Sequence, residues 1–243
     1  MTAGSERAPR RNGRARDGEA AEPHRAPGTD ASAASRFDRA YYRRFYGSSA
    51  TRVHGAREIG HLARGVSGIA AWLGVDLRSV LDVGAGTGLW RDWFRRHRPE
   101  VAYRSIDVSP HACRVYGHER RDISAWRTAR RFDLVVCHGV LQYLDREAAG
   151  RAIDNVGAMC RGLLYLEALT EEDASVLDPE ATDMAIQVRP AQWYRTRLQR
   201  HFVQVGAGLW ASARSGVRLY ALEGAAIAHM ASPPSTSTQR PEK

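Results

Sequence analysis

A glycine-rich turn between a predicted strand and a predicted helix constrains the fold more than any other feature of this sequence. The stretch LDVGAGTG (81–88) overlaps the apolar run SVLDV (79–83) and leads into GLWRDWFRRHRP (88–99), whose apolar residues recur at helical spacing. Glycine lets a backbone turn sharply and approach a ligand closely. The GxGxG pattern therefore predicts a strand–turn–helix unit whose turn binds a ligand.

Strand and helix patterns alternate through the middle of the chain. Further strands are expected at AYRSIDVS (102–109), HERRDI (118–123), FDLVVCHGVLQYL (132–144) and GLLYLEAL (162–169), with a helix capped by Asp145 at 145–160. Such alternation implies an α/β fold with a parallel sheet and helices on both faces. The last two strand patterns, FVQVGAGLW (202–210) and SGVRLYAL (215–222), are joined by a short turn and predict an antiparallel hairpin.

The distribution of apolar residues predicts one domain with two tails. Residues 1–36 are basic and rich in Ala, Arg, Gly and Pro, and residues 227–243 are rich in Ser, Thr and Pro. Because neither segment can bury enough surface to offset the entropy lost on ordering, we expect both tails to be disordered. The domain then spans 37–226. Its first helices, within 37–74, either close over a ligand as a lid or pack on the sheet.

Composition excludes several classes of protein. Lys243 is the only lysine among 36 basic residues, so P-loop nucleotide binding, Schiff-base chemistry and a kinase active site are not expected. The 3 cysteines form no CxxC pair, which disfavours a structural zinc site or a disulfide framework. Neither a membrane-spanning stretch nor a secretory signal is recognised. We therefore expect a cytoplasmic protein with no membrane partner and no bound metal.

Two carboxylates accompany the glycine turn. Asp107 ends the second predicted strand, 23 residues after Gly84, where an acid can accept hydrogen bonds from both hydroxyls of a ribose. Asp82 lies two residues before Gly84, and an acid so close suits the ammonium of an amino acid. The spacing GxGxG also differs from the GxGxxG of dinucleotide sites, which disfavours an NAD-dependent oxidoreductase.

Taken together, these segments resemble the class I S-adenosylmethionine-dependent methyltransferases. The resemblance rests on VLDVGAGTGLW (80–90), SIDVS (105–109), RRDI (120–123) and FDLVVCHGVLQYLD (132–145), in the family's order, and extends over most of 78–223. It implies a Rossmann-like, seven-stranded, mostly parallel sheet whose sixth and seventh strands are the hairpin. It also implies S-adenosylmethionine as the cofactor, S-adenosylhomocysteine as the product and a methyltransferase as the enzyme class.

The resemblance further assigns a cofactor site. In the family, the glycine loop wraps the methionine part, the acid after strand two holds the ribose and the acid after strand three meets the adenine. Residues after strand four line the reaction site. The cofactor contacts expected on this basis are Asp82, Gly84, Ala85, Gly86, Thr87, Gly88, Asp107, Val108, Asp122, Ile123, His138 and Gly139.

Two residues at the same edge of the sheet are candidates for catalysis. Methyl transfer mainly requires alignment, and a general base helps when the acceptor carries a proton. His138 follows the fourth strand and is the candidate base, because histidine changes its charge near neutral pH; the alternative is a structural turn histidine. Glu167, at the end of the fifth strand, is the second candidate, with a solvated or ion-paired acid as its alternative. Arg189, Trp193 and Tyr194 are candidates for lining an acceptor pocket, and for Trp193 and Tyr194 packing in a helix core is the favoured alternative.

The acceptor is expected to be a small molecule, methylated on oxygen, nitrogen or carbon. The net charge of +9 leaves open an RNA, DNA or protein methyltransferase. The arginines are scattered, however, which favours a solvated basic surface, and no aromatic RNA-binding module is recognised. Nucleic acid is therefore not the expected partner. A non-catalytic cofactor-binding protein is the third possibility, and the oligomeric state is left open.

Overall fold

The computed structural model describes residues 35–47, 54–175, 177–178 and 182–219. The predicted tails lie outside the described residues, except for Ser35 and Arg36. The Arg36 guanidinium donates hydrogen bonds to the carbonyl oxygen of Ala185 at 2.8 Å and to Asp183 Oδ2 at 2.7 Å. Contacts with the domain therefore begin before the predicted boundary at residue 37.

Most of the predicted helices and strands form. The helices are α2 (Arg39–Tyr46), α3 (Ala56–Trp72), α4 (Leu89–His97), α5 (Pro110–Tyr116), α6 (Arg146–Met159) and α7 (Ala191–Leu198), with short 3₁₀ turns at Leu141–Tyr143 and Glu171–Asp173. The strands are β1 (Ser79–Val83), β2 (Ala102–Asp107), β3 (Glu119–Arg120), β4 (Phe132–His138), β5 (Cys160–Glu167), β6 (Phe202–Gly206) and β7 (Leu209–Ser212). Side-chain caps begin two of these helices. The Ser109 side chain accepts the N–H of Ala112 at the start of α5, and the Asp145 side chain accepts that of Ala148 at the start of α6.

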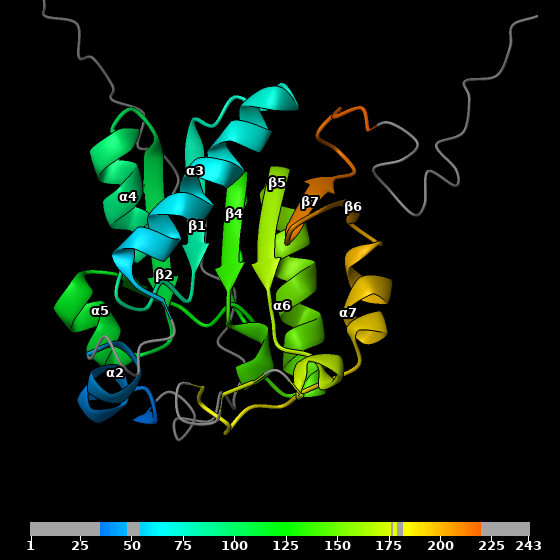
Figure 1. Cartoon of the computed structure of the whole chain (residues 1–243). Helices are drawn as coiled ribbons and strands as arrows, with labels where there is room; N and C mark the ends of the chain where they lie inside the picture. Colours follow the sequence, from blue (N-terminus) through cyan, green and yellow to red (C-terminus); the bar gives the residue numbers. More distant parts are fainter. Residues whose placement is uncertain (1–34, 48–53, 176, 179–181, 220–243) are drawn as a thin grey trace, which may run out of the picture.

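The seven strands form one sheet in the order β3-β2-β1-β4-β5-β7-β6 (Figure 1). Strands β1 to β5 run parallel, whereas β7 pairs antiparallel with both β5 and β6. This confirms the predicted Rossmann-like, seven-stranded, mostly parallel sheet with an antiparallel C-terminal hairpin. The chain moves outward from β1 to β2 and β3, and in the opposite direction from β4 to β5, so β1 and β4 meet at the switch point where such sheets bind ligands.

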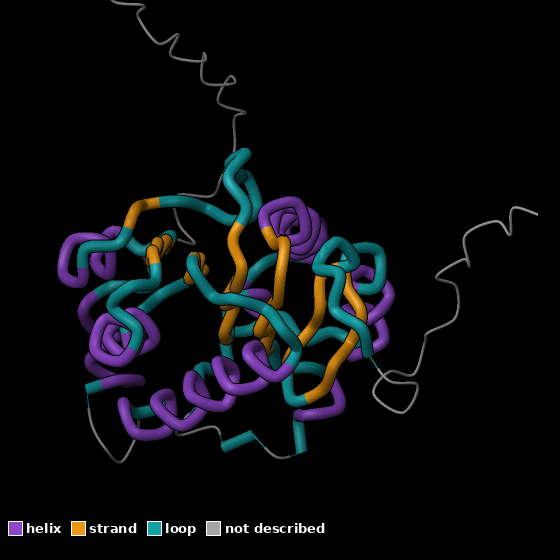
Figure 2. The backbone as a smooth tube through the Cα atoms, turned by 90° about the horizontal axis from the view of Figure 1, so that it is seen from above, coloured by secondary structure: helices purple, strands orange, loops and turns teal. Residues whose placement is uncertain are grey.

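Helices cover both faces of the sheet, as Figure 2 shows. Helices α3 and α4 pack on one face and α6 and α7 on the other, each with its own buried apolar cluster. Strand β4 is buried on both faces: Leu134 and Val136 join one cluster, while Val135 and Cys137 join the other. Such two-sided burial explains why this strand is an unbroken apolar run. Within the described part of the chain, no helix is long and apolar enough to cross a membrane.

The hairpin lies earlier in the chain than the sequence predicts. The apolar run 202–210 is not one strand, because a turn at Gly206, Ala207 and Gly208 divides it into β6 and β7. All three residues have positive φ angles, and a Cβ at Gly208 would lie only 2.8 Å from the Tyr165 ring. The second predicted strand, 215–222, is wrong: residues 215–219 form no strand, and the remainder lies outside the described residues.

The third strand is also shorter than predicted. Only Glu119 and Arg120 pair with β2. His118 is buried before the strand begins, and Asp122 starts a turn in which its carbonyl oxygen accepts the N–H of Trp126 at 2.8 Å. A short edge strand of this kind has too few residues to show a recognisable strand pattern in the sequence.

Asp133 joins three strands at the amino ends of the sheet. Its Oδ2 accepts hydrogen bonds from the N–H and hydroxyl of Ser79 at 2.9 and 2.8 Å and from the N–H of Arg78 at 3.1 Å. Its Oδ1 accepts from Arg161 Nε at 2.7 Å. Burial alone would raise the pKa of Asp133, but these hydrogen bonds outweigh it and hold the pKa below its ordinary value. The carboxylate therefore fixes β1, β4 and β5 relative to one another.

We expect Asp133→Asn to lower the free energy of unfolding by about 1.5–3 kcal/mol at neutral pH, because the amide presents an N–H group to donors that need an acceptor. The folded-state pKa lies below the unfolded value of about 3.9. The carboxylate's contribution is therefore complete above that pH and is lost as the pH falls through the folded-state pKa. In urea unfolding, the free energies of unfolding of wild type and Asp133→Asn should converge as the pH falls into the acid range. Asp76→Asn, at an exposed neighbour, should match the wild type. Equal stability of Asp133→Asn and wild type at neutral pH would contradict this role.

Candidate active site

The glycine turn adopts a backbone conformation that requires glycine. Gly84, Gly86 and Gly88 have φ angles of 67°, 56° and 82°, which lie in the left-handed region. The N–H groups of Gly84 and Ala85 both donate to the carbonyl oxygen of Ile106, at 2.9 and 3.1 Å. The predicted sharp turn between β1 and α4 is thus confirmed, and it is tied to the end of β2.

The surroundings of the glycines differ. A Cβ on Gly84 would lie 2.4 Å from Cγ2 of Val140, so the side chain of Val140, two residues after β4, packs directly against the turn. A Cβ on Gly86 would meet the Tyr42 ring and the Gly84 carbonyl oxygen only at 3.9 Å. Position 86 therefore requires glycine because of its backbone angle. Position 84 requires it both for the backbone angle and because the Val140 side chain leaves no room for a Cβ.

Asp107 ends β2 with its carboxylate at the glycine turn. Its Oδ2 accepts the N–H of Gly86 at 2.9 Å, and its Oδ1 accepts the N–H of Ser109 at 2.8 Å. Burial raises the pKa of Asp107, and the two backbone N–H groups oppose the rise. Because each carboxylate oxygen can accept two hydrogen bonds, each can still accept one from a ligand. This geometry suits a pair of adjacent hydroxyls.

His118 contacts the same turn, although the sequence analysis did not assign it to the site. Its Nε2 lies 3.0 Å from the carbonyl oxygen of Gly86, and its Nδ1 lies 2.8 Å from Ser105 Oγ. A carbonyl can only accept, so Nε2 carries the proton and Nδ1 accepts from the Ser105 hydroxyl. Burial lowers the pKa of His118, which favours this neutral ring. Its position before an irregular edge strand offered no sequence signal.

Asp82 is buried within β1. Its Oδ2 accepts a hydrogen bond from the Tyr103 hydroxyl at 2.8 Å. Burial raises the pKa of Asp82 to about 7, against the opposing effect of the Tyr103 bond. Burial therefore disfavours the ionised form of this carboxyl in comparison with a solvated aspartate. Its observed hydrogen-bond partner belongs to β2 rather than to the turn.

The remaining predicted cofactor residues lie on the loops at the same edge. These are Ala85 and Thr87 in the turn, Val108 after β2, Asp122 and Ile123 after β3, and Gly139 after β4. Asp122 Oδ1 accepts the N–H of Ser124 at 2.8 Å, and Ile123 is buried. Asp122 thus has a clear local structural role, and both of its carboxylate oxygens can still accept hydrogen bonds.

Helix α2 covers the turn at this edge of the sheet (Figure 1). Tyr42 is buried, and its ring lies beside Gly86. The hydroxyls of Tyr41 and Tyr143 lie 3.0 Å apart, which links α2 to the 3₁₀ turn after β4. These contacts pack α2 against the glycine turn and the turn after β4.

A second group of polar side chains lies at the ends of β4 and β5. The register of the two strands pairs His138 with Glu167, and His138 Nε2 lies 3.1 Å from Glu167 Oε1. The Tyr165 hydroxyl donates to Glu167 Oε2 at 2.9 Å, and His54 Nε2 lies 3.8 Å from Oε1. The indole N–H of Trp90 donates to His138 Nδ1 at 3.3 Å. The structure therefore brings both predicted catalytic residues together and adds three others.

Glu167 is held as a carboxylate in this group. The hydrogen bond with His138, and next the nearby imidazole of His54, lower the pKa of Glu167 far below its ordinary value, against the opposing effect of burial. A carboxylate stabilised in this way is a weak proton acceptor but a good hydrogen-bond acceptor. His54 precedes Glu167 by 113 residues and belongs to no motif, so only the fold reveals their proximity.

Three other candidates prove to be parts of the core. Arg189 is buried, and its guanidinium donates to the carbonyl oxygen of Leu141 at 3.2 Å and to the Tyr194 hydroxyl at 3.0 Å. Tyr194 belongs to a buried apolar cluster, and Trp193 packs against it. The core-packing alternative therefore describes these aromatic residues. Cys137 is fully buried, and burial raises its pKa to about 12, as expected for a structural strand cysteine.

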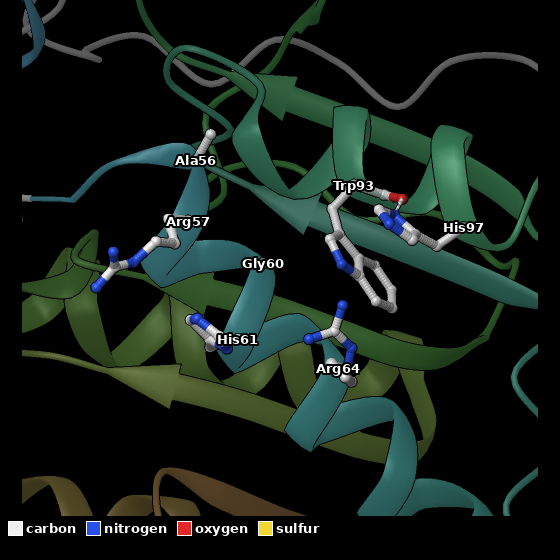
Figure 3. A pocket seen from close by; sticks show the side chains of 7 residues that line it. All are labelled: Ala56, Arg57, Gly60, His61, Arg64, Trp93 and His97. Carbon is white, nitrogen blue, oxygen red and sulfur yellow. Dashed lines mark hydrogen bonds between the residues drawn. The ribbon is translucent and has the colours of Figure 1, made fainter.

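A pocket of about 220 Å³ lies between α3 and α4, on the outer side of that helical layer (Figure 3). Arg57, His61 and Arg64 of α3 line it together with Trp93 and His97 of α4. The Trp93 and His97 rings stack 4.9 Å apart. This basic pocket is separate from the glycine turn and from the group around Glu167, and its residues fit the predicted solvated basic surface.

The fold is that of an open α/β protein whose strand order reverses direction between β1 and β4, the place where such sheets bind ligands. A family model described as a methyltransferase domain matches residues 53–204, and the chain belongs to that family. A search of curated proteins found no significant match.

Solved structures share the fold. The N-methyltransferase NodS from Bradyrhizobium japonicum WM9, in complex with S-adenosyl-L-homocysteine, is 19% identical, with a TM-score of 0.52 over 73% of this chain and 98% of that one. DesVI of Streptomyces venezuelae is 16% identical, with a TM-score of 0.50 over 63% of this chain and 91% of that one.

Replacing His118 with alanine should destabilise the protein by about 1–3 kcal/mol at neutral pH, because the Gly86 carbonyl and the Ser105 hydroxyl lose a buried partner. The folded-state pKa of His118 lies below the unfolded value of about 6.5, so the neutral ring's contribution is complete above that pH and declines as the pH falls. Urea unfolding on both sides of that pH should therefore show a steeper loss for wild type than for His118→Ala. The control is His61→Ala, at an exposed histidine of α3. Parallel pH profiles for wild type and His118→Ala would rule out the neutral ring.

Proposed function

We propose that the protein is an S-adenosylmethionine-dependent methyltransferase that acts on a small-molecule acceptor at an oxygen, nitrogen or carbon atom. The observation that carries this proposal is the 2.9 Å hydrogen bond between the Asp107 carboxylate and the N–H of Gly86. This bond holds a carboxylate that suits a diol beside a turn whose backbone a ligand can approach closely. Both lie at the switch point of the sheet. The complex of NodS with S-adenosyl-L-homocysteine supports the choice of cofactor.

The edge residues fit the three parts of this cofactor. Asp107 would hold the ribose hydroxyls through the two hydrogen bonds that its oxygens can still accept. The turn from Gly84 to Gly88 would hold the methionyl part, with Asp82 as the carboxyl nearest its ammonium. Asp122 and Ile123 would border the adenine. The left-handed angles of the glycines support this assignment, because such a turn lets a ligand come close to the backbone.

S-adenosylmethionine supplies a methyl group on a sulfonium, which is already a reactive electrophile. The task left to the chain is to align the acceptor and keep water out, and alignment alone can contribute about 7–11 kcal/mol. Helix α2 lies over the turn with Tyr42 beside Gly86, which supports a role in covering the bound cofactor. Opening of α2 would then accompany cofactor exchange.

We assign the acceptor to the ends of β4 and β5. His138 and Glu167 lie there, two and three strands away from Asp107 respectively, and Val140 connects this region to Gly84 through direct contact. The group around Glu167 can accept hydrogen bonds from an acceptor and orient it. A small acceptor is favoured because the described residues form one sheet-centred unit, with no further domain among them to bind a macromolecule.

Asp107→Ala should weaken the binding of S-adenosylhomocysteine by about 1–3 kcal/mol, because hydrogen bonds to a charged acceptor are lost. The affinity of Asp107→Asn should lie between those of the wild type and Asp107→Ala, since its amide retains one acceptor oxygen. Isothermal titration calorimetry on the full chain measures the affinities, with Asp76→Ala as a control at an exposed acid. Unchanged affinity in Asp107→Ala would remove the ribose role.

Full-length protein with methyl-labelled S-adenosylmethionine should transfer label to a member of a panel of phenols, alcohols, amines and activated carbon acids. Gly84→Val should abolish transfer, because it adds a branched side chain to a left-handed position already in contact with Val140. RNA and protein acceptors form separate arms, and label in either arm alone, with salt-sensitive binding for RNA, would replace the small-molecule assignment. Cofactor binding without transfer in any arm would favour a non-catalytic protein.

A further inference from the structure

The group at the ends of β4 and β5 has the spacing of a metal site. His54, His138 and Glu167 each offer one ligand atom, and these atoms lie within 4.8 Å of one another. Two imidazoles and a carboxylate can bind a divalent transition metal. Whether these side chains do so depends on which ring nitrogens carry protons, and the neighbouring residues settle that.

Trp90 determines the protonation of His138. An indole N–H can only donate, so His138 Nδ1 accepts it at 3.3 Å. In the neutral ring the proton then lies on Nε2, which donates to Glu167 Oε1 at 3.1 Å. Metal-bound histidines normally show the opposite arrangement, in which the second nitrogen donates to an acceptor. These directions oppose metal binding by His138. Its one lone pair, on Nδ1, already accepts the indole N–H and is not free to take a proton from a substrate.

His54 is in a different position. Its Nε2 lies 3.8 Å from Glu167 Oε1, which is beyond hydrogen-bond distance. Its ring contacts that of His138, with the centroids 4.8 Å apart. The His54 side chain is 36% exposed, against 12% for His138. Of the two histidines, His54 is therefore the accessible one, and a small movement brings its nitrogen to the carboxylate.

We infer that His54 accepts the proton that the acceptor loses, that Glu167 stabilises the resulting imidazolium, and that His138 acts as a positioning residue for Glu167. This inference rests on the proposed methyl transfer and refines it. It transfers the role of base from His138, where the sequence suggested it, to a residue outside every motif. It also names the acceptor class, an oxygen or nitrogen that carries a hydrogen.

The step balances without a further reactant. The lone pair of the acceptor atom forms the bond to the methyl carbon, the bond from that carbon to the sulfonium sulfur breaks, and its electron pair stays on sulfur. The proton of the acceptor passes to the unprotonated nitrogen of His54. The positive charge therefore moves from the sulfonium to an imidazolium beside Glu167. His138 on β4 and Tyr165 on β5 face this carboxylate and hold it in place.

A first test needs no acceptor. Diethyl pyrocarbonate reacts with imidazole nitrogens that have a free lone pair, and peptide mass spectrometry of the full chain identifies the modified histidines. We expect His54 to be modified while His138 stays unmodified. Trp90→Phe removes the indole donor and should make His138 reactive, with the thermal unfolding midpoint confirming that the variant folds. Modification of His138 in the wild type as fast as that of His54 would overturn the inference.

A second test addresses protonation and metal binding directly. Long-range ¹H–¹⁵N spectra of the histidine rings should show His138 protonated on Nε2 at neutral pH. Titration of the wild type and of His54→Asn with Zn²⁺ should show no site that depends on His54. A one-to-one Zn²⁺ site that is lost in His54→Asn, or a His138 ring protonated on Nδ1, would contradict the inference.

A third test uses the acceptor found in the labelled-methyl screen. His54→Asn should lower the turnover number by about 10²–10⁴-fold, as expected for loss of a general base. Its affinity for S-adenosylhomocysteine should be unchanged, and added imidazole should restore part of the activity of His54→Gly. His61→Asn, at an exposed histidine of the following helix α3, is the matched control. Wild-type turnover in His54→Asn would refute the assignment of His54 alone, whereas failure of the wild type to bind S-adenosylhomocysteine would refute the proposed function itself.

Discussion

The hydrogen bonds from the backbone N–H groups of Gly86 and Ser109 to the Asp107 carboxylate hold together the parts of this edge. A buried carboxylate is costly unless it is hydrogen-bonded, and these two donors offset that cost. They also join the glycine turn, the end of β2 and the start of α5 at one side chain. His118 then binds the carbonyl oxygen of the same Gly86, so both backbone polar groups of this glycine are engaged. The position of the turn depends on this network, and the position of any ligand bound by the turn depends on it as well.

The edge has two halves that differ in chemistry. Around Asp107, the carboxylate is buried beneath α2 and bonded to backbone, which suits permanent binding contacts. Around Glu167, one side chain each from β4, from β5 and from the segment just before α3 meet at a partly exposed carboxylate. Such a group can change its hydrogen bonds as a substrate enters. A methyltransferase needs both kinds of environment, because the cofactor must be held while acceptors come and go.

The sequence predicted the strands that are buried on both faces, since a buried parallel strand such as β4 is a continuous apolar run. It also predicted the glycine turn and the strand-end acid Asp107, because both follow directly from local backbone requirements. The hairpin and β3 were placed inaccurately. The run 202–210 contains a turn whose signal, Gly206 and Gly208, lies inside an apolar pattern, and the two-residue β3 leaves almost no pattern at all.

By itself the sequence determined the order of strands and helices, the turn between β1 and α4, and the presence of His138 and Glu167 at strand ends. Only the tertiary structure decided which polar groups meet. It brought His54 to Glu167 across 113 residues, and it set the indole of Trp90 against His138 so that the ring is protonated on the side of Glu167. The physical reason is that backbone preferences are local, so residues close together in the sequence determine them. Hydrogen-bond direction and proton position depend on groups that come together only when the sheet has formed.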